Sequence, residues 1–309
     1  MVKPILSLRD LSRRLGTSLE TLDLLATNIK SHYHTWSSLS EKTHKVRVFR
    51  APNPELMRIL KRVNSNILAE HFLDESAHGG LRGRSPRTNA EQHLAKSLVI
   101  TMDVRSFFPK VRHAMVYRMF RHDMGFGRDV ARLLTRLTTL DAQLPQGAPT
   151  SGTIANILLT NSVDSQTSKS ATAIAVVNTR YIDDLAFSGP RSRALINDTA
   201  KALSRKRLPI WRNRPNRQGQ IKLKIMPRCG PQMVTGLLVN SKRGPSVPRK
   251  YRDAVRAAIH QLSKLERPEL SGALSSIRGK IRYVATFNPG AACRLSTYLN
   301  KHSARPTNS

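Results

Sequence analysis

The stretch AIAVVNTRYIDDLAFSG, residues 173–189, decides what kind of fold this chain adopts. Apolar and β-branched runs flank Asp183 and Asp184, and this pattern predicts two strands joined by a tight turn at the two aspartates. A carboxylate at the end of an apolar strand is costly unless it is paired, hydrogen-bonded or metal-bound. The aspartates are therefore a candidate site, although a solvated hairpin turn is the plain alternative.

A second apolar strand ends in the same way. LVITMD, residues 98–103, reads as a buried strand that closes on Asp103. Carboxylates brought together raise one another's pKa unless a divalent cation neutralises them. Oxygen ligands with no nearby His or Cys favour Mg²⁺ over Zn²⁺. Two such ions can clamp the attacking and leaving oxygens of an in-line phosphoryl displacement.

The charge of the chain indicates a polyanionic partner. Its 309 residues include 52 Lys and Arg against 20 Asp and Glu, which gives a net charge of +32. Such a field excludes most enzymes of small metabolites and is typical of nucleic-acid-binding proteins, ribosomal-type proteins included. Residues 199–252 hold 15 Lys and Arg and no acidic residue. We expect contacts with nucleic-acid phosphates there.

Cysteine use and hydropathy point to the cytoplasm. Cys229 and Cys293 are far apart and have no CxxC partner, so neither a disulfide framework nor a zinc site is expected. No apolar run approaches the roughly 18 residues of a membrane-spanning helix. MVKPILSLRDLSRRLG, at the start of the chain, has no apolar core of a signal peptide. We expect no membrane partner.

Periodicity supplies the remaining elements. Helical spacing covers residues 5–33, with a helix start at Thr17 or Ser18. A basic strand is expected at 45–52, a loop at 141–152 and a helix from 153 onward. Other expected helices are Asn89–Lys96 and two C-terminal segments, YRDAVRAAIHQLSKL and ELSGALSSIRGKIRYVATF, separated at Pro268. Only the last residues, KHSARPTNS (301–309), are expected to be unstructured.

Three segments together carry a family resemblance. DVRSFF (103–108), LPQGAPTSG (144–152) and YIDD (181–184) resemble motifs A, B and C of reverse transcriptases, in the same order. The resemblance implies an α+β right-hand polymerase with fingers, an antiparallel-sheet palm and a thumb. The implied domains are 1–95 for the N-terminal helix and fingers, 96–244 for the palm with a finger insertion, and 245–309 for the helical thumb.

The resemblance also implies roles for single residues in catalysis. Asp103, Asp183 and Asp184 would ligate two Mg²⁺ ions for transfer from dNTP substrates. In QIKLKIMP (220–227), Lys222 is the nearer match for the lysine that protonates pyrophosphate, and Lys224 is the competing assignment.

Substrate contacts follow in the same way. Phe108 aligns with the aromatic residue that acts in this family as the steric gate against a ribose 2′-OH, although core packing is an alternative role. Gln146 and Gly147 would touch the incoming nucleotide and the template backbone, and Asn156 matches the Asn of the next helix. Arg47 of KVRVFRAP aligns with the arginine that holds the triphosphate, with template phosphate as an equal alternative.

Two short signatures resemble those of retron reverse transcriptases. They are Asn89-Ala90-x-x-His93 and Val234-Thr235-Gly236, predicted RNA-binding residues whose plain reading is a helix start and a strand end. From the length of the chain we expect no maturase extension, endonuclease or RNase H domain. YIDD stands where most retron enzymes have YADD, and TSG where they have Ser-Pro.

The retron resemblance implies specific partners. They are a cognate structured noncoding RNA that supplies a priming 2′-OH, the multicopy single-stranded DNA product, and a separately encoded effector protein in antiphage defence. A non-retron reverse transcriptase of defence systems and a noncatalytic RNA-binding protein on a polymerase-like scaffold are the alternatives.

Overall fold

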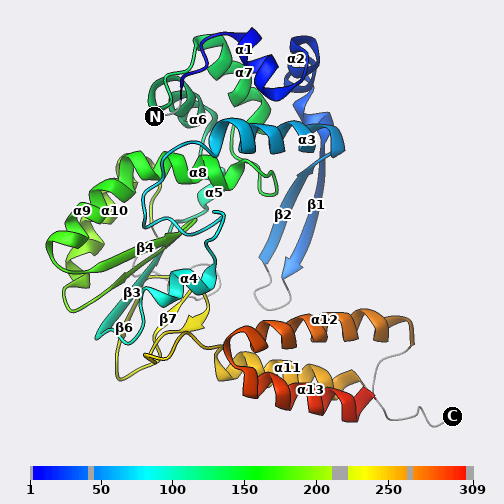
Figure 1. The fold of residues 1–309 in the computed structure, drawn as a ribbon, viewed down its shortest axis with the longest axis vertical. Coiled ribbons are helices and arrows are strands. Elements are labelled where there is room, and N and C mark those ends of the chain that lie inside the picture. Colours follow the sequence, from blue (N-terminus) through cyan, green and yellow to red (C-terminus); the bar gives the residue numbers. More distant parts are fainter. Residues whose placement is uncertain (1–2, 41–44, 211–221, 263–266, 304–309) are drawn as a thin grey trace. The chain divides into compact units, whose positions relative to one another are not determined.

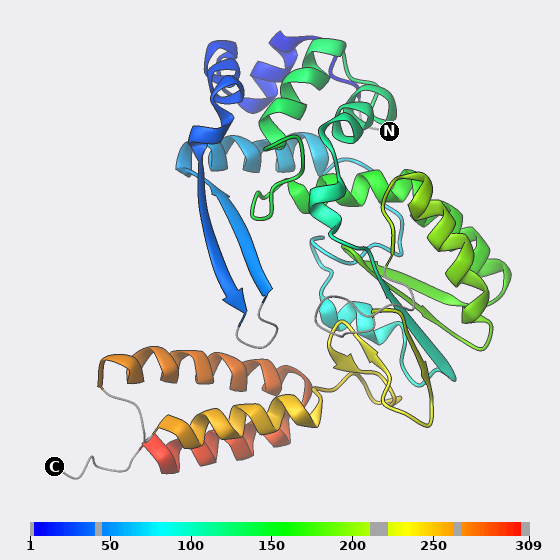
Figure 2. The same ribbon diagram turned by 180° about the vertical axis from the view of Figure 1, so that it is seen from behind.

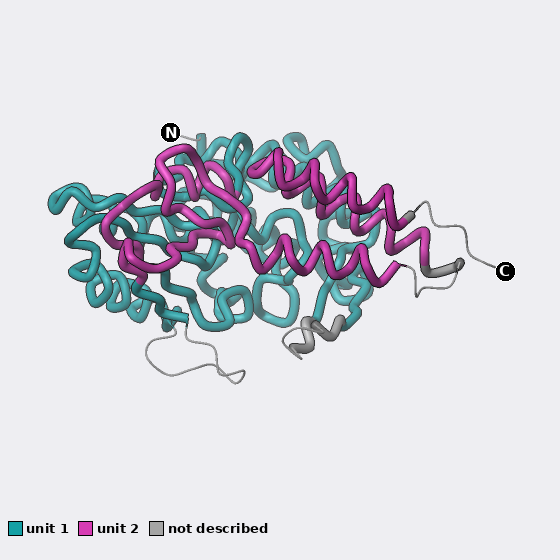
Figure 3. Tube along the Cα trace, turned by 90° about the horizontal axis from the view of Figure 1, so that it is seen from below, with its two compact units in different colours: residues 1–85, 100–225 teal, residues 86–99, 226–309 magenta. Residues whose placement is uncertain are grey.

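The computed structural model describes residues 3–40, 45–210, 222–262 and 267–303 (Figure 1). For residues 38–40, 45–47, 267–269 and 303 it describes the backbone only. The chain divides into two compact units, coloured separately in Figure 3: unit 1 holds residues 1–85 and 100–225, and unit 2 holds 86–99 and 226–309. Each unit is therefore built from two separate stretches of sequence.

Unit 1 contains most of the helices and strands. Its α-helices are α1 (Leu8–Leu15), α2 (Leu19–Thr27), α3 (Pro54–Val63), α5 (Phe107–Lys110), α6 (His113–Arg118), α7 (Arg128–Thr138), α8 (Ser151–Leu159), α9 (Ser165–Ala173) and α10 (Leu195–Arg205). Short 3₁₀ and π segments are η1 (Ile29–His32), η2 (Asn64–Leu68), η3 (Met119–Asp123), η4 (Thr160–Asp164) and η5 (Ser192–Ala194). Its strands are β1 (Tyr33–Ser40), β2 (Lys45–Pro52), β4 (Val177–Tyr181) and β5 (Asp184–Ser188), while β3 (Leu98–Asp103) and β6 (Lys224–Pro227) cross the boundary between the units.

The N-terminal helical segment is two helices. Gly16 takes a left-handed φ of 54° and ends α1, which an L side chain would resist. Ser18 then caps α2, since its hydroxyl accepts a hydrogen bond from the amide of Thr21 at 3.2 Å. The start expected at Thr17 or Ser18 is confirmed at Ser18.

The strands form antiparallel pairs. β1 and β2 make a long hairpin in which Trp36 opposes and stacks on Phe49, with ring centroids 5.6 Å apart (Figures 1 and 2). A four-stranded sheet has the order β4-β5-β3-β6, and β4 pairs antiparallel with β5. Helix α9 contacts β4 and also α10, so it covers part of this sheet. The mixture of helices with antiparallel strands confirms the expected α+β class.

Unit 2 combines a small strand pair with helices. Its elements are α4 (Pro86–Glu91), β7 (Met233–Val234), β8 (Leu237–Leu238), α11 (Arg249–Gln261), α12 (Arg267–Phe287) and α13 (Pro289–Ser303). Helices α11, α12 and α13 contact one another pairwise. Their buried side chains include Val255 and Ile259 of α11, Val284 of α12 and Leu299 of α13, so each helix has an apolar, buried side.

Three sequence expectations were wrong in their bounds. The helix expected at Asn89–Lys96 is α4 and begins at Pro86, because proline favours the first helical position. The tight turn lies at Ile182 and Asp183, since Asp184 already pairs with Tyr181. The segment from 289 to 303 is a further helix, α13, so Lys301 to Ser303 are helical.

In the described residues, no helix is both long and apolar enough to span a membrane.

Candidate active site

Asp103 lies where a buried strand meets the surface. Val99 and Ile100 are fully buried in β3, and the Asp103 side chain that follows is 14% exposed. The next amide, that of Val104, donates to the carbonyl of Asp183 at 3.1 Å. This hydrogen bond holds the end of β3 against the turn between β4 and β5, where Asp183 lies.

The turn itself places two carboxylates side by side. Ile182 has a left-handed φ of 58°, an uncommon conformation for a β-branched residue. The turn leaves Asp183 half-buried and Asp184 exposed at the start of β5. Strain of this kind at a turn persists only where the surroundings hold it in place.

Burial and mutual repulsion disfavour the charged form of both aspartates. Burial and the nearby Asp103 carboxylate raise the pKa of Asp183 to about 6. Burial, Asp183 and Asp103 raise the pKa of Asp184 to about 7. The Asp184 side chain is nevertheless exposed, so solvent screens part of this repulsion. The three carboxylates therefore act on one another electrostatically.

Lys222 is the cation at this site. Its ammonium lies 2.7 Å from Asp103 Oδ2. Burial lowers the pKa of Lys222, but the hydrogen bond to Asp103 and the attraction of the three carboxylates outweigh it and raise the pKa overall. Lys224 also lowers the pKa of Asp184 but forms no described ion pair. Lys222 is therefore the charged lysine nearest the carboxylates.

The donor set fits a hard divalent cation. No group of three or more His, Cys, Asp or Glu side chains in the described residues is arranged closely enough to hold a metal ion. The chemistry still suits one, because Asp183 and Asp184 supply carboxylate oxygens. Burial, and after it the repulsion between the carboxylates, raises their pKa values, and a bound cation would offset both effects.

A buried arginine supports the turn from behind. Arg180, 1% exposed, forms a bidentate ion pair with Asp164 at 2.8 and 2.6 Å. Its Nη1 donates to Asn156 Oδ1 at 2.8 Å and to the carbonyl of Ile182 at 2.9 Å. Sequence reasoning missed this residue, and the signal was a charged residue inside an otherwise uncharged strand.

Asn156 belongs to the same network. It is fully buried, its Oδ1 accepts from Arg180, and its Nδ2 donates to the carbonyl of Gly79 at 2.8 Å. A Cβ at Gly79 would lie 2.5 Å from the amide nitrogen of Ile182, so the loop packs directly on the turn. Both ends of the Asn156 amide are therefore used within the protein, and nucleotide contact by Asn156 stays a prediction.

The predicted nucleotide loop packs on strand β2. The carbonyl of Gln146 accepts from the amide of Arg50 at 2.9 Å. Gly147 has a φ of 125°, and a Cβ there would lie 2.6 Å from the carbonyl oxygen of Arg50. Arg50 also pairs with Asp141 at 3.0 Å. Arg47 lies in β2, but its side chain is outside the described residues.

Phe108 is a partly exposed aromatic close along the chain to Asp103. It lies in α5, packed edge-on against the buried Phe107 with centroids 5.5 Å apart. Ser106 before it has a φ of 49° and turns the chain sharply from β3 into α5. The ring is thus anchored on one side, and its role as a gate stays a prediction.

The two short signatures lie together in unit 2. Asn89 and His93 are buried in and after α4, which contacts β7 and β8. The Thr235 hydroxyl donates to the carbonyl of Pro86 at 3.0 Å. Val234 is buried, whereas Gly236, with a φ of 81°, is exposed. The structure joins these segments, buries Asn89, His93 and Val234, and leaves the turn at 235–236 accessible to solvent.

The site thus comprises three carboxylates beside an antiparallel strand pair, in a strongly basic chain. Residues 39–207, more than half of the chain, match the family model for "Reverse transcriptase (RNA-dependent DNA polymerase)". The chain belongs to the reverse transcriptase family.

Its curated relatives are retron reverse transcriptases. The retron Mx65 enzyme of Myxococcus xanthus is 31% identical over 283 residues, covering 86% of this chain and 64% of the relative. The retron Ec86 enzyme of Escherichia coli is 26% identical over 299 residues, covering 96% of this chain and 89% of the relative. The chain spans just under two thirds of the length of the Mx65 enzyme and of a second Myxococcus relative, the retron Mx162 enzyme, 28% identical over 310 residues.

Proposed function

We propose that this chain is an RNA-directed DNA polymerase of the retron type. The observation that carries the proposal is the hydrogen-bonded contact of the β3 end with the β4–β5 turn, which gathers Asp103, Asp183 and Asp184. Membership of the reverse transcriptase family and likeness to retron enzymes support it. The proposed fold is a right hand, with fingers from 1–95, palm from 96–244 and a thumb from 245–309.

The three aspartates are the proposed ligands of two Mg²⁺ ions. Bound there, the ions would supply Lewis-acid stabilisation of the attacking and leaving oxygens. Lys222 Nζ lies 2.7 Å from Asp103 Oδ2, and we assign Lys222 as the acid that protonates the departing pyrophosphate. A lysine ammonium is protonated at neutral pH and therefore has a proton to give to a departing oxygen.

The surrounding residues position the dNTP. Phe108, held by Phe107, is the proposed gate that excludes a ribose 2′-OH. Gln146 and Gly147, held on β2, are proposed to contact the nucleotide and the template backbone. Arg47 is proposed to bind the triphosphate. Since the amide of Asn156 is engaged with Arg180 and Gly79, we propose that it acts by holding the loop and turn together.

The retron character adds an RNA partner. We propose that a cognate structured noncoding RNA primes synthesis from a 2′-OH and is copied into multicopy single-stranded DNA in the cytoplasm. Because Asn89, His93 and Val234 are buried, their part would be to support the exposed turn at Thr235 and Gly236 for RNA contact. Action with an effector protein in antiphage defence belongs to the same proposal.

The test compares two variants of matched charge change. Asp183→Asn with Asp184→Asn should abolish Mg²⁺-dependent primer extension on an RNA template while RNA binding persists. Asp129→Asn with Asp198→Asn, two exposed aspartates of α7 and α10, is the control and should leave extension unchanged. Sequencing the nucleic acid that copurifies with the parent then tests the retron part.

The outcomes separate the alternatives. Extension by the double variant would overturn the metal assignment. A short DNA joined to RNA through a debranching-sensitive bond supports a retron, whereas RNA alone with active extension points to another reverse transcriptase of defence systems. A parent without any extension would leave the noncatalytic RNA-binding reading.

A further inference from the structure

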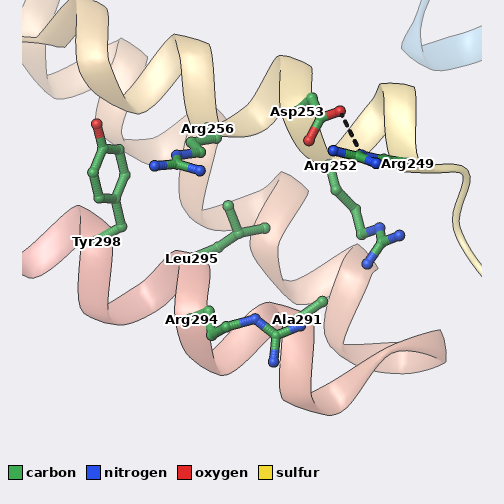
Figure 4. Close-up of a pocket in the computed structure, with 8 residues that line it drawn as sticks. All are labelled: Arg249, Arg252, Asp253, Arg256, Ala291, Arg294, Leu295 and Tyr298. Carbon is green, nitrogen blue, oxygen red and sulfur yellow. Dashed lines mark ion pairs between the residues drawn. The ribbon is translucent and has the colours of Figure 1, made fainter.

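A second concentration of positive charge lies in unit 2, between helices α11 and α13. A cavity of about 550 Å³ is lined there by Arg249, Arg252, Arg256 and Arg294, together with Asp253 and Tyr298 (Figure 4). We call this cavity the arginine groove. The arginines come from both helices, so the charge is gathered by the packing of the helices and not by a run in the sequence.

The charge of the arginine groove is mostly uncompensated. Arg249 pairs with Asp253 at 3.6 Å, whereas Arg252, Arg256 and Arg294 form no ion pair with any described carboxylate. Arg256 instead lies over the ring of Tyr298, 5.2 Å from its centroid, which orients the guanidinium without neutralising it. Three net positive charges therefore converge on one cavity.

Arg252 carries a further sign of a missing partner. Its Nε is buried and has no hydrogen-bond partner in the described residues. A buried donor without an acceptor is costly, and native structures rarely leave one. An anion in the arginine groove would supply the acceptor.

The backbone adds to the same potential. The amide of Val247, just before α11, donates to Asn288 Oδ1, just before α13, at 2.8 Å. The two helices run in the same direction, so their N-termini lie together (Figure 1). Helix N-termini carry partial positive charge and free amides that favour phosphate. Arg249, Arg252 and Arg294 all lie in the first two turns of these helices.

We propose that the arginine groove binds the phosphodiester backbone of an unpaired segment of the structured RNA partner. The existence of that partner rests on the proposed function. Guanidinium forks match phosphate oxygens better than any other side chain. Cavities of roughly 300–1,000 Å³ enclose single small molecules, so the groove fits one nucleotide and not a duplex. Unpaired loops and bulges are the segments by which proteins recognise RNA sequence-specifically.

The test removes the charge without touching the proposed polymerase residues. The full chain carries Arg252→Gln, Arg256→Gln and Arg294→Gln, and the probe is a labelled transcript of the region upstream of the gene. The control carries Arg278→Gln, Lys280→Gln and Arg282→Gln, three exposed residues of α12 with the same loss of charge. Unfolding curves establish that each variant is folded.

The groove variant should bind the transcript roughly tenfold more weakly or worse, since charged hydrogen bonds are lost. Its slope of log affinity against log salt should be smaller by about 2, because three phosphate contacts on a single strand release fewer counterions. The control should stay within about threefold of the parent. A third variant, Arg252→Lys with Arg256→Lys and Arg294→Lys, should keep the slope but bind more weakly, because the planar guanidinium forks are lost.

Extension of a supplied primer–template separates the outcomes. It should be unchanged in the groove variant, and a parallel loss would assign the groove to the template–primer and overturn the proposal. Equal RNA binding by parent and groove variant, or an equal loss in the control, would overturn it as well. A parent that binds RNA through the groove but extends no primer would refute the proposed function alone.

Discussion

Removing the guanidinium of Arg180 should lower the free energy of unfolding far more than removing the charge of an arginine at the surface. Arg180 and Asp164 are 1% and 3% exposed, and their two hydrogen bonds measure 2.8 and 2.6 Å. Arg180→Met would leave the Asp164 carboxylate buried without a cation, which costs about 3–5 kcal/mol. The variant would also remove the donors to Asn156 and to the Ile182 carbonyl.

The assay is urea unfolding followed by circular dichroism, with two comparison variants. Arg136→Met breaks an ion pair of equal length, 2.8 Å to Asp23, but at 33% and 65% exposure. It should cost less than about 1 kcal/mol, because water screens such pairs. Arg180→Met with Asp164→Leu removes both charges and should recover much of the lost stability.

Activity then separates stability from positioning. If Arg180 also fixes the turn, the double variant should remain impaired in primer extension although it is folded, because the Ile182 carbonyl still lacks its donor. The reasoning is refuted if Arg180→Met costs less than about 1 kcal/mol. It is equally refuted if the single variant is no less stable than Arg136→Met.

Two further predictions test the loop that packs on the turn. Burial, together with the nearby Arg84 guanidinium, lowers the pKa of His78 to about 4. The stability that neutral His78 contributes is therefore full above about pH 6.5 and is lost as the pH falls through 4. Unfolding at several pH values should show a loss of about 2–3 kcal/mol in the parent that His78→Gln lacks. Gly79→Ala should destabilise the chain by at least about 2 kcal/mol, because its Cβ would lie 2.5 Å from the Ile182 nitrogen. Gly272→Ala in α12, where a Cβ would meet nothing within 4 Å, should stabilise the chain by about 0.5–1 kcal/mol in the same assay. Equal effects of the two substitutions would contradict the packing argument.

The sequence predicts the strands of the site better than the support behind them. The strand ending at Asp103 and the pair around the aspartates follow from short apolar runs, which report local burial. The turn was misplaced by one residue because Ile182 takes a left-handed conformation that β-branched residues rarely adopt. Such a conformation depends on tertiary contacts that periodicity does not contain.

Long-range polar contacts were the least predictable part. Asn156 meets the Gly79 carbonyl across 77 residues, and Arg180 meets Asp164 in the core, where a charged residue is not expected without a partner. The basic run at 199–252 was predicted as one RNA grip. Part of it lies outside the described residues, and two groove arginines, Arg256 and Arg294, lie beyond it in the sequence.

The discontinuous make-up of unit 2 has a consequence during protein synthesis. The hydrogen bond between Pro86, at the start of α4, and Thr235 can form only after Thr235 has been synthesised, 149 residues after Pro86. At about 5–20 residues per second, that delay is roughly 7–30 s. Throughout this interval the rest of unit 2, which buries Asn89 and His93 in the folded chain, has not been synthesised. The nascent segment 86–99 is therefore available to a chaperone for the whole of this time.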